Sequence, residues 1–463
     1  MNDERVSHPS PASGEASGTA AAAGTAPGTA GRMPLPADTS RRMRVMAAMS
    51  GGVDSAVAAA LLAEQGHEVT GVTLKLACYG KTPMSPRACC TLDAMDDARR
   101  VAMKMGFPYH VVDAEQVFRE RVMLPWADGY ATGRTLYPCA SCNQHLKFGD
   151  LFNRMELAAA DVLVTGHYAR VRQERDGSWG LYRALDATKD QTYALATIPY
   201  AVLPKVAFPL GELPKSEVRA HAQRLGLSVW DKPESQDLCF VPDGDYAGYI
   251  TGTIGETRGT QPGAFLDERG RVIGTHRGVI HYTIGQRKGL GLAMPERWYV
   301  VAIDATANTV TLGPRQALER SALLAEPPHW LMAAPPPPGT RALVRIRYNH
   351  AGAMATLWPE GTGPLKICFD EPQLAVTPGQ LAVMYLGERC IGGAVIRHSL
   401  RAAGPDAAVV ETAGPDAAVV ETAGPDAARS DEPGSSAASV AAAGSHGPGR
   451  PAAMPVSPSA PRA

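Results

Sequence analysis

Two groups of residues in this chain have the types and the spacing that a chemical site needs. The first is Ser50-Gly51-Gly52-Val53-Asp54-Ser55 (the SGGVDS loop), in which two glycines let the backbone approach a ligand closely. An apolar run precedes it and an alanine-rich run follows it, so we expect a strand, a tight turn and the start of a helix. The free N–H groups and the dipole of such a helix start favour an anion, which makes the loop a candidate phosphate cradle. The ending of the Walker motif is missing, and the alternative is an ordinary strand–helix turn capped by a serine.

The second group consists of cysteines. Cys139 and Cys142 are separated by two residues and stand just before an expected helix, whose N-terminus would lower the pKa of a thiol. A single pair of this kind can be a redox pair, half of a zinc site or part of an iron–sulfur site. Cys239 stands alone in a polar stretch, an unusual setting for a buried structural thiol, whereas Cys368 and Cys390 lie in strand-like runs typical of a core.

Other polar residues follow the expected strands. Gly166-His167 comes directly after the apolar run 162–165, which would place it at the ligand-facing edge of a sheet, although a lone histidine is more often only hydrogen-bonded. The triplet Lys189-Asp190-Gln191 can belong to a site or to a solvated turn. In the stretch 269–297 six basic residues stand against one acidic residue, a bias that suits a phosphate backbone as well as a solvated face.

The elements that must position these residues alternate between strand and helix. The predicted strands cover 45–49, 69–74, 109–112 and 162–165, and the predicted helices cover 55–65, 92–105 and 148–159. Strict alternation of this kind predicts an α/β fold with a doubly wound parallel sheet and helices on both of its faces. Ligands of such sheets bind at the carboxyl ends of the strands, where the SGGVDS loop falls.

Downstream of about residue 211 the pattern changes. A predicted helix over 215–225 precedes segments rich in Pro, Gly and Asp, and short predicted strands then cover 298–303, 309–312, 342–348, 353–358, 365–369, 381–386 and 391–397. Turn sequences between these strands predict a small antiparallel barrel or sandwich. The predicted organisation is a disordered tail over 1–41, a nucleotide-binding domain over 42–212, a central domain over 213–296, a C-terminal β-barrel over 297–400 and a disordered low-complexity tail over 401–463.

Composition limits the partners. The 463 residues are 45% hydrophobic and 20% charged, as in globular proteins, and no apolar run approaches the roughly 20 residues of a membrane span. The formal net charge is −1, but the tails 1–42 and 401–463 carry 0 and −3, which leaves +2 for residues 43–400 and permits an RNA partner. Eight cysteines without a signal peptide favour thiols, redox groups or metal ligands in a reducing compartment. We therefore expect a cytoplasmic protein with no membrane partner.

From Met43 to Leu400 the chain resembles the bacterial tRNA-specific 2-thiouridylase family, a branch of the PP-loop ATP pyrophosphatases. The SGGVDS loop alone is typical of that whole superfamily, and the ordered set of motifs makes the resemblance specific. The set comprises Ser50 to Ser55, Cys142-Asn143, Thr165-Gly166-His167-Tyr168, Lys189-Asp190-Gln191, Cys239-Phe240-Val241, the run from His281 to Gly291 and Thr377-Pro378-Gly379-Gln380.

The resemblance implies a reaction in which ATP adenylates O2 of the wobble uridine U34 with release of pyrophosphate, and a protein persulfide then delivers sulfur to C2 as AMP leaves. It implies ATP and Mg²⁺ as cofactors, tRNAs with Lys, Glu or Gln anticodons as substrates, and a persulfide-carrying donor protein as a partner. The positions that would line the nucleotide are Ala48, Met49, Ser50, Gly51, Gly52, Val53, Asp54, Ser55, Leu74 and Gly166. The positions that would contact tRNA are His167, Lys189, Asp190, Gln191, Arg347, Tyr348 and Gln380.

The resemblance also assigns roles to the cysteines. In the family, the cysteine that matches Cys239 carries the persulfide, and the one that matches Cys142 is the nucleophile that resolves it as a disulfide. Well-known members have an aspartate three residues before that nucleophile, a candidate general acid or base, where this chain has Cys139. Cys139, Cys142 and Cys239 also resemble the three-cysteine [4Fe-4S] ligand set of related tRNA thiolases, whose open iron can bind sulfide. The persulfide mechanism, the cluster mechanism and the identity of the acid or base therefore stay open.

Two other functions are compatible with parts of the sequence. A PP-loop enzyme that adenylates a small molecule would need neither the barrel-like region 298–398 nor the basic stretch 269–297. A non-catalytic RNA-binding module with a structural zinc held by cysteines would leave the SGGVDS loop unexplained.

Overall fold

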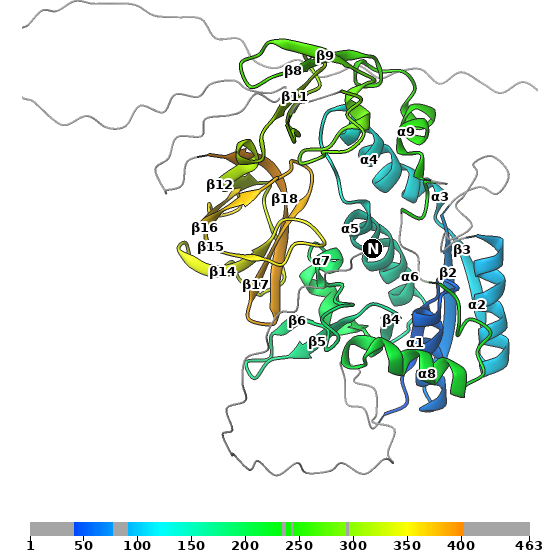
Figure 1. The fold of residues 1–463 in the computed structure, drawn as a ribbon. Helices are drawn as coiled ribbons and strands as arrows, with labels where there is room; N and C mark the ends of the chain where they lie inside the picture. Colours follow the sequence, from blue (N-terminus) through cyan, green and yellow to red (C-terminus); the bar gives the residue numbers. More distant parts are fainter. Residues whose placement is uncertain (1–40, 77–90, 234–237, 242–243, 293–295, 402–463) are drawn as a thin grey trace, which may run out of the picture. The chain divides into compact units, whose positions relative to one another are not determined.

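The computed structural model describes residues 41–76, 91–233, 238–241, 244–292 and 296–401 (Figure 1). Nearly all of the two tails predicted to be disordered lies outside these residues. Within the described ranges, no helix has both the length and the apolar character that crossing a bilayer requires.

The N-terminal part is built on a five-stranded parallel sheet with the order β3-β2-β1-β4-β7. Its strands are β1 (Arg44–Ala48), β2 (Glu68–Lys75), β3 (Tyr109–Asp113), β4 (Val162–Thr165) and β7 (Val206–Ala207). All neighbouring strands run parallel, which confirms the predicted α/β fold. The strand order reverses between β1 and β4, and ligands of such sheets bind beside this point, at the carboxyl ends of the strands.

Helices cover both faces of this sheet because neighbouring residues of each strand point to opposite sides. Val45 and Ala47 of β1 pack into one apolar cluster, which also contains residues of α1 (Val53–Glu64), α2 (Leu92–Met105) and α8 (Lys215–Arg224). Met46 lies between them and packs into a second cluster with α6 (Leu151–Leu157). The alternating apolar pattern of β1 therefore builds a core on each face.

The predicted helix α2 shows how the local sequence sets helix ends. The Thr91 side chain accepts a hydrogen bond of 3.1 Å from the N–H of Ala94, which caps the first turn. At the other end Gly106 adopts a φ of +76°, the left-handed conformation that glycine adopts at low cost. The predicted end of this helix at residue 105 is confirmed.

A run of helices connects β3 to β4, and the sequence analysis predicted only its last part, over 148–159. It comprises α3 (Glu115–Phe118), the π-helical η1 (Arg119–Met123), α4 (Leu124–Ala131), α5 (Pro138–Cys142), the π-helical η2 (Asn143–Asp150) and α6. The predicted helix over 148–159 is thus only the last part of a helical run that begins at Pro138, a residue favoured in a first turn. Cys139 and Cys142 lie within this run rather than just before it.

The central part contains α9 (Tyr246–Ile254) and a four-stranded sheet with the order β10-β11-β8-β9. Its strands are β8 (Gly263–Leu266), β9 (Val272–His276), β10 (Tyr299–Asp304) and β11 (Thr309–Gly313). The sequence analysis placed the strands over 298–303 and 309–312 in the C-terminal barrel, and this grouping is wrong. Phe265 of β8 shares an apolar cluster with Val300 and Val310, and that long-range packing selects the pairing, which strand periodicity cannot indicate.

The C-terminal part is an antiparallel barrel, as predicted. The strands are β12 (Glu319–Ala325), β13 (His329–Trp330), β14 (Thr340–Arg345), β15 (Ala353–Pro359), β16 (Leu365–Leu374), β17 (Leu381–Leu386) and β18 (Arg389–Leu400). The order is β12-β16-β15-β14-β17-β18, and an additional pairing of β12 with β18 closes the barrel. A hairpin from the N-terminal part, β5 (Ala169–Gln173) and β6 (Trp179–Arg183), extends the sheet beyond β18.

Short helical segments complete the described chain. They are α7 (Thr192–Leu195), η3 (Tyr200–Lys205), η4 (Pro209–Glu212), η6 (Arg258–Thr260), η7 (Val279–His281) and η8 (Arg315–Leu318).

Candidate nucleotide and sulfur-transfer site

The SGGVDS loop joins β1 to α1 beside the residues that follow β4, at the reversal of strand order. Gly51 adopts a φ of +70°, and a Cβ there would lie 2.1 Å from the carbonyl oxygen of Ala94. A Cβ on Gly166 would lie 2.5 Å from the backbone nitrogen of Ser55. Both positions therefore require glycine, because the loop, α2 and the end of β4 meet backbone to backbone. The predicted nucleotide-lining residues Gly51, Ser55 and Gly166 are brought together in this way.

The loop is held by its own serines. Ser50 N–H donates to Ser55 Oγ at 3.0 Å, the two hydroxyl oxygens lie 3.2 Å apart, and Ser55 Oγ donates to the Gly52 carbonyl at 3.2 Å. The N-cap of α1 is Gly52, and among the described residues no side chain caps this helix. The N-cap position is therefore not occupied by a serine, as the alternative of an ordinary capped turn assumed. The uncapped helix start can direct its N–H groups at an anion.

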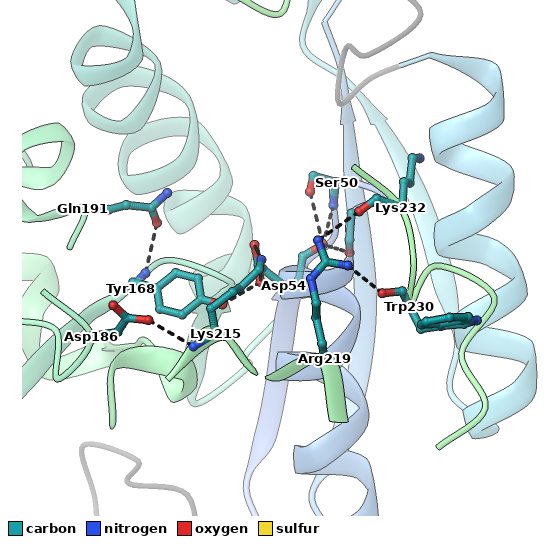
Figure 2. Close-up of polar contacts among 11 residues, drawn as sticks. Ser50, Asp54, Tyr168, Asp186, Gln191, Lys215, Arg219, Trp230 and Lys232 are labelled. Atoms are coloured by element: carbon teal, nitrogen blue, oxygen red, sulfur yellow. Dashed lines mark hydrogen bonds and ion pairs between the residues drawn. The ribbon is translucent and has the colours of Figure 1, made fainter. Parts of the chain in front are cut away.

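Asp54, in the first turn of α1, is paired with a lysine from α8 (Figure 2). Lys215 Nζ lies 2.6 Å from Asp54 Oδ1 and 2.8 Å from Oδ2, and the Tyr168 hydroxyl donates to Oδ1 at 2.8 Å. The ammonium also lies 5.5 Å from the centre of the Tyr168 ring. The backbone N–H of Lys215 donates to Asp186 at 3.1 Å, which fixes the start of α8.

A second lysine contacts the loop from the segment that follows α8. Lys232 Nζ donates to the Gly51 carbonyl at 3.0 Å and to Asp97 Oδ2 of α2 at 2.8 Å. Burial alone would raise the pKa of Asp97, but hydrogen bonds from Lys232 and Arg100 overcome this effect and lower it. Arg219 of α8 donates to the carbonyls of Trp230, at 2.8 Å, and of Lys232, at 3.4 Å, so the lysine projects from a held backbone (Figure 2).

The sequence analysis did not single out Lys215 or Lys232. Both lie far along the chain from the residues they contact, 161 positions from Asp54 and 181 from Gly51. Their spacing carries no local signal, and only the packing of α8 against α1 brings them to the loop.

The remaining nucleotide-lining candidates lie on the strands that lead to the site. Leu74 stands near the carboxyl end of β2, is half-buried and packs against two apolar clusters. Ala48 ends β1, and the backbone N–H of Met49 donates to the carbonyl of Val72 in β2 at 2.8 Å. Leu74, Ala48 and Met49 thus lie at or near the carboxyl ends of β1 and β2, on the side of the sheet where the loop begins.

The two cysteines with predicted catalytic roles share one apolar environment. Cys142, at the end of α5, and Cys239 are both half-buried and pack against a cluster that contains Phe118, Trp126 and Phe240. Tyr249, a partly buried neighbour of Cys239, has its pKa raised to about 12 by burial, with a smaller contribution from that thiol. Segments almost a hundred residues apart in sequence therefore converge on one cluster.

Cys139 lies elsewhere on α5. It is exposed and contributes to the electrostatics of Tyr137, whose pKa is raised first by burial and then by this thiol. In the described chain, which includes Cys139, Cys142 and Cys239, no group of three or more His, Cys, Asp or Glu side chains is arranged to hold a metal ion. The arrangement of Cys139, Cys142 and Cys239 therefore does not fit the three-cysteine cluster. Cys78, Cys89 and Cys90, which a zinc site could also recruit, lie outside the described residues.

The two remaining described cysteines lie in the barrel. Cys390 of β18 is fully buried, and burial raises the pKa of its thiol to about 12, so it stays protonated. Cys368 of β16 is half-buried. Both positions agree with the expected core role.

His167 follows β4 and is held from both sides of its ring. Lys147 Nζ lies 3.4 Å from Nε2, and Thr165 Oγ1 lies 2.6 Å from Nδ1. Because a charged lysine can only donate, Nε2 accepts and Nδ1–H donates to Thr165. Burial, and then repulsion by Lys147, hold the pKa of His167 well below its ordinary value. The ring is therefore neutral and fixed, with Phe148 and Phe208 beside it.

The triplet that starts at Lys189 is not a solvated turn. Asp190 is buried, and its carboxylate accepts from Thr192 Oγ1 at 2.8 Å and pairs with Arg345 of β14 at 3.4 Å. Gln191 Oε1 accepts from the Tyr168 N–H at 3.0 Å, and Gln191 N–H donates to the Tyr168 carbonyl at 2.9 Å. Asp190 thus joins the N-terminal part to the barrel, and Gln191 fixes the residue whose hydroxyl contacts Asp54.

The three predicted tRNA positions of the barrel lie near the loop that leads into α5. The Tyr348 ring is stacked on Tyr137, with ring centres 6.3 Å apart. Arg347 and Gln380 line a cavity of about 360 Å³ together with Thr135, Thr283, Ile284, Gly285, Tyr299, Arg315, Leu318, Leu374, Ala375 and Thr377. This cavity brings two arginines and part of the run from His281 to Gly291 to one surface.

Comparisons with known proteins cover nearly the whole described chain. Family models match in succession: the "tRNA methyl transferase HUP domain" over residues 43–243, the "tRNA methyl transferase PRC-barrel domain" over 251–314 and the "Aminomethyltransferase beta-barrel domain" over 320–396. The protein named tRNA-specific 2-thiouridylase MnmA from Moorella thermoacetica is 46% identical over 354 residues, which are 76% of this chain and 98% of that protein. The protein of the same name from Magnetococcus marinus is 44% identical over 351 residues, with the same two coverages. The chain therefore belongs to the family of tRNA-specific 2-thiouridylases (MnmA).

Proposed function

We propose that this protein catalyses the ATP-dependent 2-thiolation of the wobble uridine of tRNA. The observation that carries the proposal is the uncapped start of α1, which follows the SGGVDS loop at the reversal of strand order in a chain that belongs to this family. A helix start of this kind is suited to hold the pyrophosphate end of ATP. The coarser function, a transferase that modifies tRNA, follows from the family.

In the first step O2 of the uridine attacks the α-phosphorus of ATP, and pyrophosphate leaves. The loop N–H groups would hold the departing pyrophosphate, and Gly166 leaves room for the end of β4 to pack against this site. Mg²⁺, which usually binds one or two carboxylates together with phosphate oxygens, would screen the charge of the triphosphate. Asp54 fits that role, since its carboxylate lies in the first turn of α1 beside the loop.

In the second step the terminal sulfur of a Cys239 persulfide bonds to C2. The Cys142 thiolate then attacks the sulfur of Cys239, so that a Cys142–Cys239 disulfide forms and the electron pair of the broken S–S bond returns to the sulfur on C2. This sulfur forms the C=S bond as the C2–O2 bond breaks, and AMP leaves with O2 on its phosphate. A thiol reductant must afterwards reduce the disulfide. The shared apolar cluster of Cys142 and Cys239 supports this pairing.

A cluster-bound sulfur mechanism is not favoured by the arrangement of the described cysteines, and we derive no step through it. His167, Lys189, Gln191 and the cavity lined by Arg347 and Gln380 would contact the tRNA. Asp190 is buried and paired with Arg345, so it would position that surface and not contact the tRNA itself. Lysine, glutamate and glutamine tRNAs would be the substrates, a persulfide-carrying protein the sulfur donor, and the cytoplasm the location.

The experiment that tests this function is mass analysis of tRNA nucleosides after incubation of unmodified tRNA with the protein, ATP, Mg²⁺ and a persulfide donor. We expect 2-thiouridine to appear only when all components are present. ATP cleavage without any change in the tRNA would favour a small-molecule adenylating enzyme instead. Binding of tRNA without ATP cleavage would favour the non-catalytic module.

A further inference from the structure

We propose that Lys215 is a phosphate-contacting residue of the nucleotide site, which rests on Asp54 in this structure and turns to the β- and γ-phosphates when the nucleotide binds. The proposal rests on the proposed function, because it takes the SGGVDS loop to be the ATP site. It concerns a residue of α8, outside every motif that pointed to the function.

The charge at the loop makes a cation necessary. Asp54 places a carboxylate in the first turn of α1, where the phosphates of ATP would also approach. Like charges at such short range repel each other strongly. Lys215 Nζ contacts both carboxylate oxygens, at 2.6 and 2.8 Å, and so cancels this charge. The Lys215 ammonium therefore already lies at the first turn of α1, beside the loop that would hold the phosphates.

The geometry lets the side chain move without the backbone. Asp186 accepts from the backbone N–H of Lys215, so the start of α8 can stay fixed while the four rotatable bonds of the lysine side chain redirect its ammonium. Asp54 would not lose every partner, because the Tyr168 hydroxyl also donates to it. The Asp54 side chain is 30% exposed and that of Lys215 is 11% exposed, so the pair is accessible from the carboxylate side.

Lys232 also contacts the SGGVDS loop, but its contacts position the loop. Its ammonium is divided between the Gly51 carbonyl and Asp97 of α2, and both contacts hold the loop against a neighbouring helix. Lys215 Nζ pairs instead with Asp54, the one acidic side chain of the loop. We therefore assign phosphate contact to Lys215 and not to Lys232.

The test measures pyrophosphate binding by calorimetry without Mg²⁺, which removes any role of Asp54 as a metal ligand. Asp54→Asn is compared with the double variant Asp54→Asn/Lys215→Met. In the single variant the carboxylate that pairs with Lys215 and repels the phosphates is gone, so pyrophosphate should bind at least as tightly as to the wild type. In the double variant we expect affinity to fall about 10- to 100-fold, the usual loss for a hydrogen bond between charged groups. AMP lacks the β- and γ-phosphates, so the affinity for AMP should differ less than about threefold between the single and the double variant.

Equal pyrophosphate affinity of the single and double variants would overturn the proposal, because Lys215 would then act only by neutralising Asp54. An equal loss for pyrophosphate and AMP would overturn it as well. Lys205→Met is the matched control, since it removes an exposed lysine that pairs with Glu156 at 2.7 Å, and its pyrophosphate affinity should equal that of the wild type. If the double variant fails to fold, Asp54→Asn/Lys215→Gln replaces it with the same expectation. A wild-type protein that binds neither ATP nor pyrophosphate would contradict the proposed function itself.

Discussion

Gln380 of the barrel donates a hydrogen bond from Nε2 to the Thr135 carbonyl at 2.7 Å, across 245 positions of the chain. The Thr135 N–H donates in turn to the Pro378 carbonyl at 2.9 Å. Thr135 lies four residues before Cys139, so this pair of contacts holds the segment that leads into α5. The motif Thr377-Pro378-Gly379-Gln380 therefore has a structural role that is separate from any contact with tRNA.

Gly379→Ala should loosen this junction. Gly379 has a φ of +92°, and a Cβ there would lie 2.9 Å from backbone atoms of Thr135. Gly361→Ala is the control, because Gly361 has a φ of +59° but nothing lies within 4 Å of its Cβ position. We expect urea unfolding to show a loss of about 1–3 kcal/mol for Gly379→Ala, clearly more than for Gly361→Ala. Thiolation by folded Gly379→Ala should also fall; equal effects of the two changes would show that the junction contributes nothing.

Asp190→Ala should destabilise the fold, because it leaves Arg345 partly buried without its carboxylate. The side chains of the pair are 5% and 13% exposed, and breaking such a buried pair costs about 3–5 kcal/mol. The exposed pair of Glu64 and Arg224 gives a matched control, for which Glu64→Ala should cost only about 0–1 kcal/mol. Denaturant unfolding measures both. If Asp190 acts only in tRNA binding, its replacement should weaken tRNA binding and leave the unfolding midpoint unchanged.

The local part of this fold could be predicted from sequence, because the signals are themselves local. The apolar pattern of β1 and β2 and the bounds of helix α2 each depend on neighbouring residues. The helical run from Glu115 to Asp150 was missed because its π-helical segments interrupt the 3.6-residue apolar period on which helix prediction depends.

The partners of each element were harder to predict than the elements. Strands β10 and β11 were found but assigned to the wrong sheet, and the hairpin β5–β6 was missed although it extends the barrel. In the same way the glycines of the SGGVDS loop could be recognised, whereas Lys215 could not. Its contact with Asp54 depends on the packing of α8 against α1, which no spacing along the chain encodes.

The pKa of His167 predicts a loss of stability in mild acid. Burial and Lys147 hold this pKa well below the ordinary value of 6.5, so the unfolded chain takes up a proton at a pH where the folded protein does not. The stabilising contribution is thus complete above about pH 6.5 and falls below it, by up to about 1.4 kcal/mol per pH unit.

His167→Gln should therefore reduce the dependence of the free energy of unfolding on pH between about pH 6.5 and pH 5. Lys147→Met keeps the histidine but removes the repulsion by the lysine, which is the smaller of the two causes of the lowered pKa. The pH dependence of its free energy of unfolding should therefore lie between those of the wild type and His167→Gln. Urea titrations at several pH values measure this. Identical slopes for all three proteins would contradict the neutral state of the partly buried ring.

The cysteine variants separate the two sulfur mechanisms. Cys239→Ser should abolish 2-thiouridine formation and leave tRNA binding nearly intact, because the cysteine would carry the sulfur and not the substrate. Cys142→Ser should allow a persulfide to form on Cys239 and block its resolution, which mass spectrometry of the intact protein detects as one added sulfur atom. Cys368→Ser is the control in the barrel and should keep its activity.

Cys139→Ser gives the decisive comparison, because the persulfide mechanism as proposed needs only Cys142 and Cys239, whereas a three-cysteine cluster needs all three thiols. Cys139 is exposed, whereas Cys142 and Cys239 are half-buried and pack against one apolar cluster, and this difference favours the first mechanism. We therefore expect Cys139→Ser to retain thiolation, and we expect active protein purified without oxygen to contain neither iron nor acid-labile sulfide in stoichiometric amounts. Iron and sulfide that are present in active wild-type protein and lost together with activity in Cys139→Ser would reverse this conclusion and assign the sulfur to a cluster.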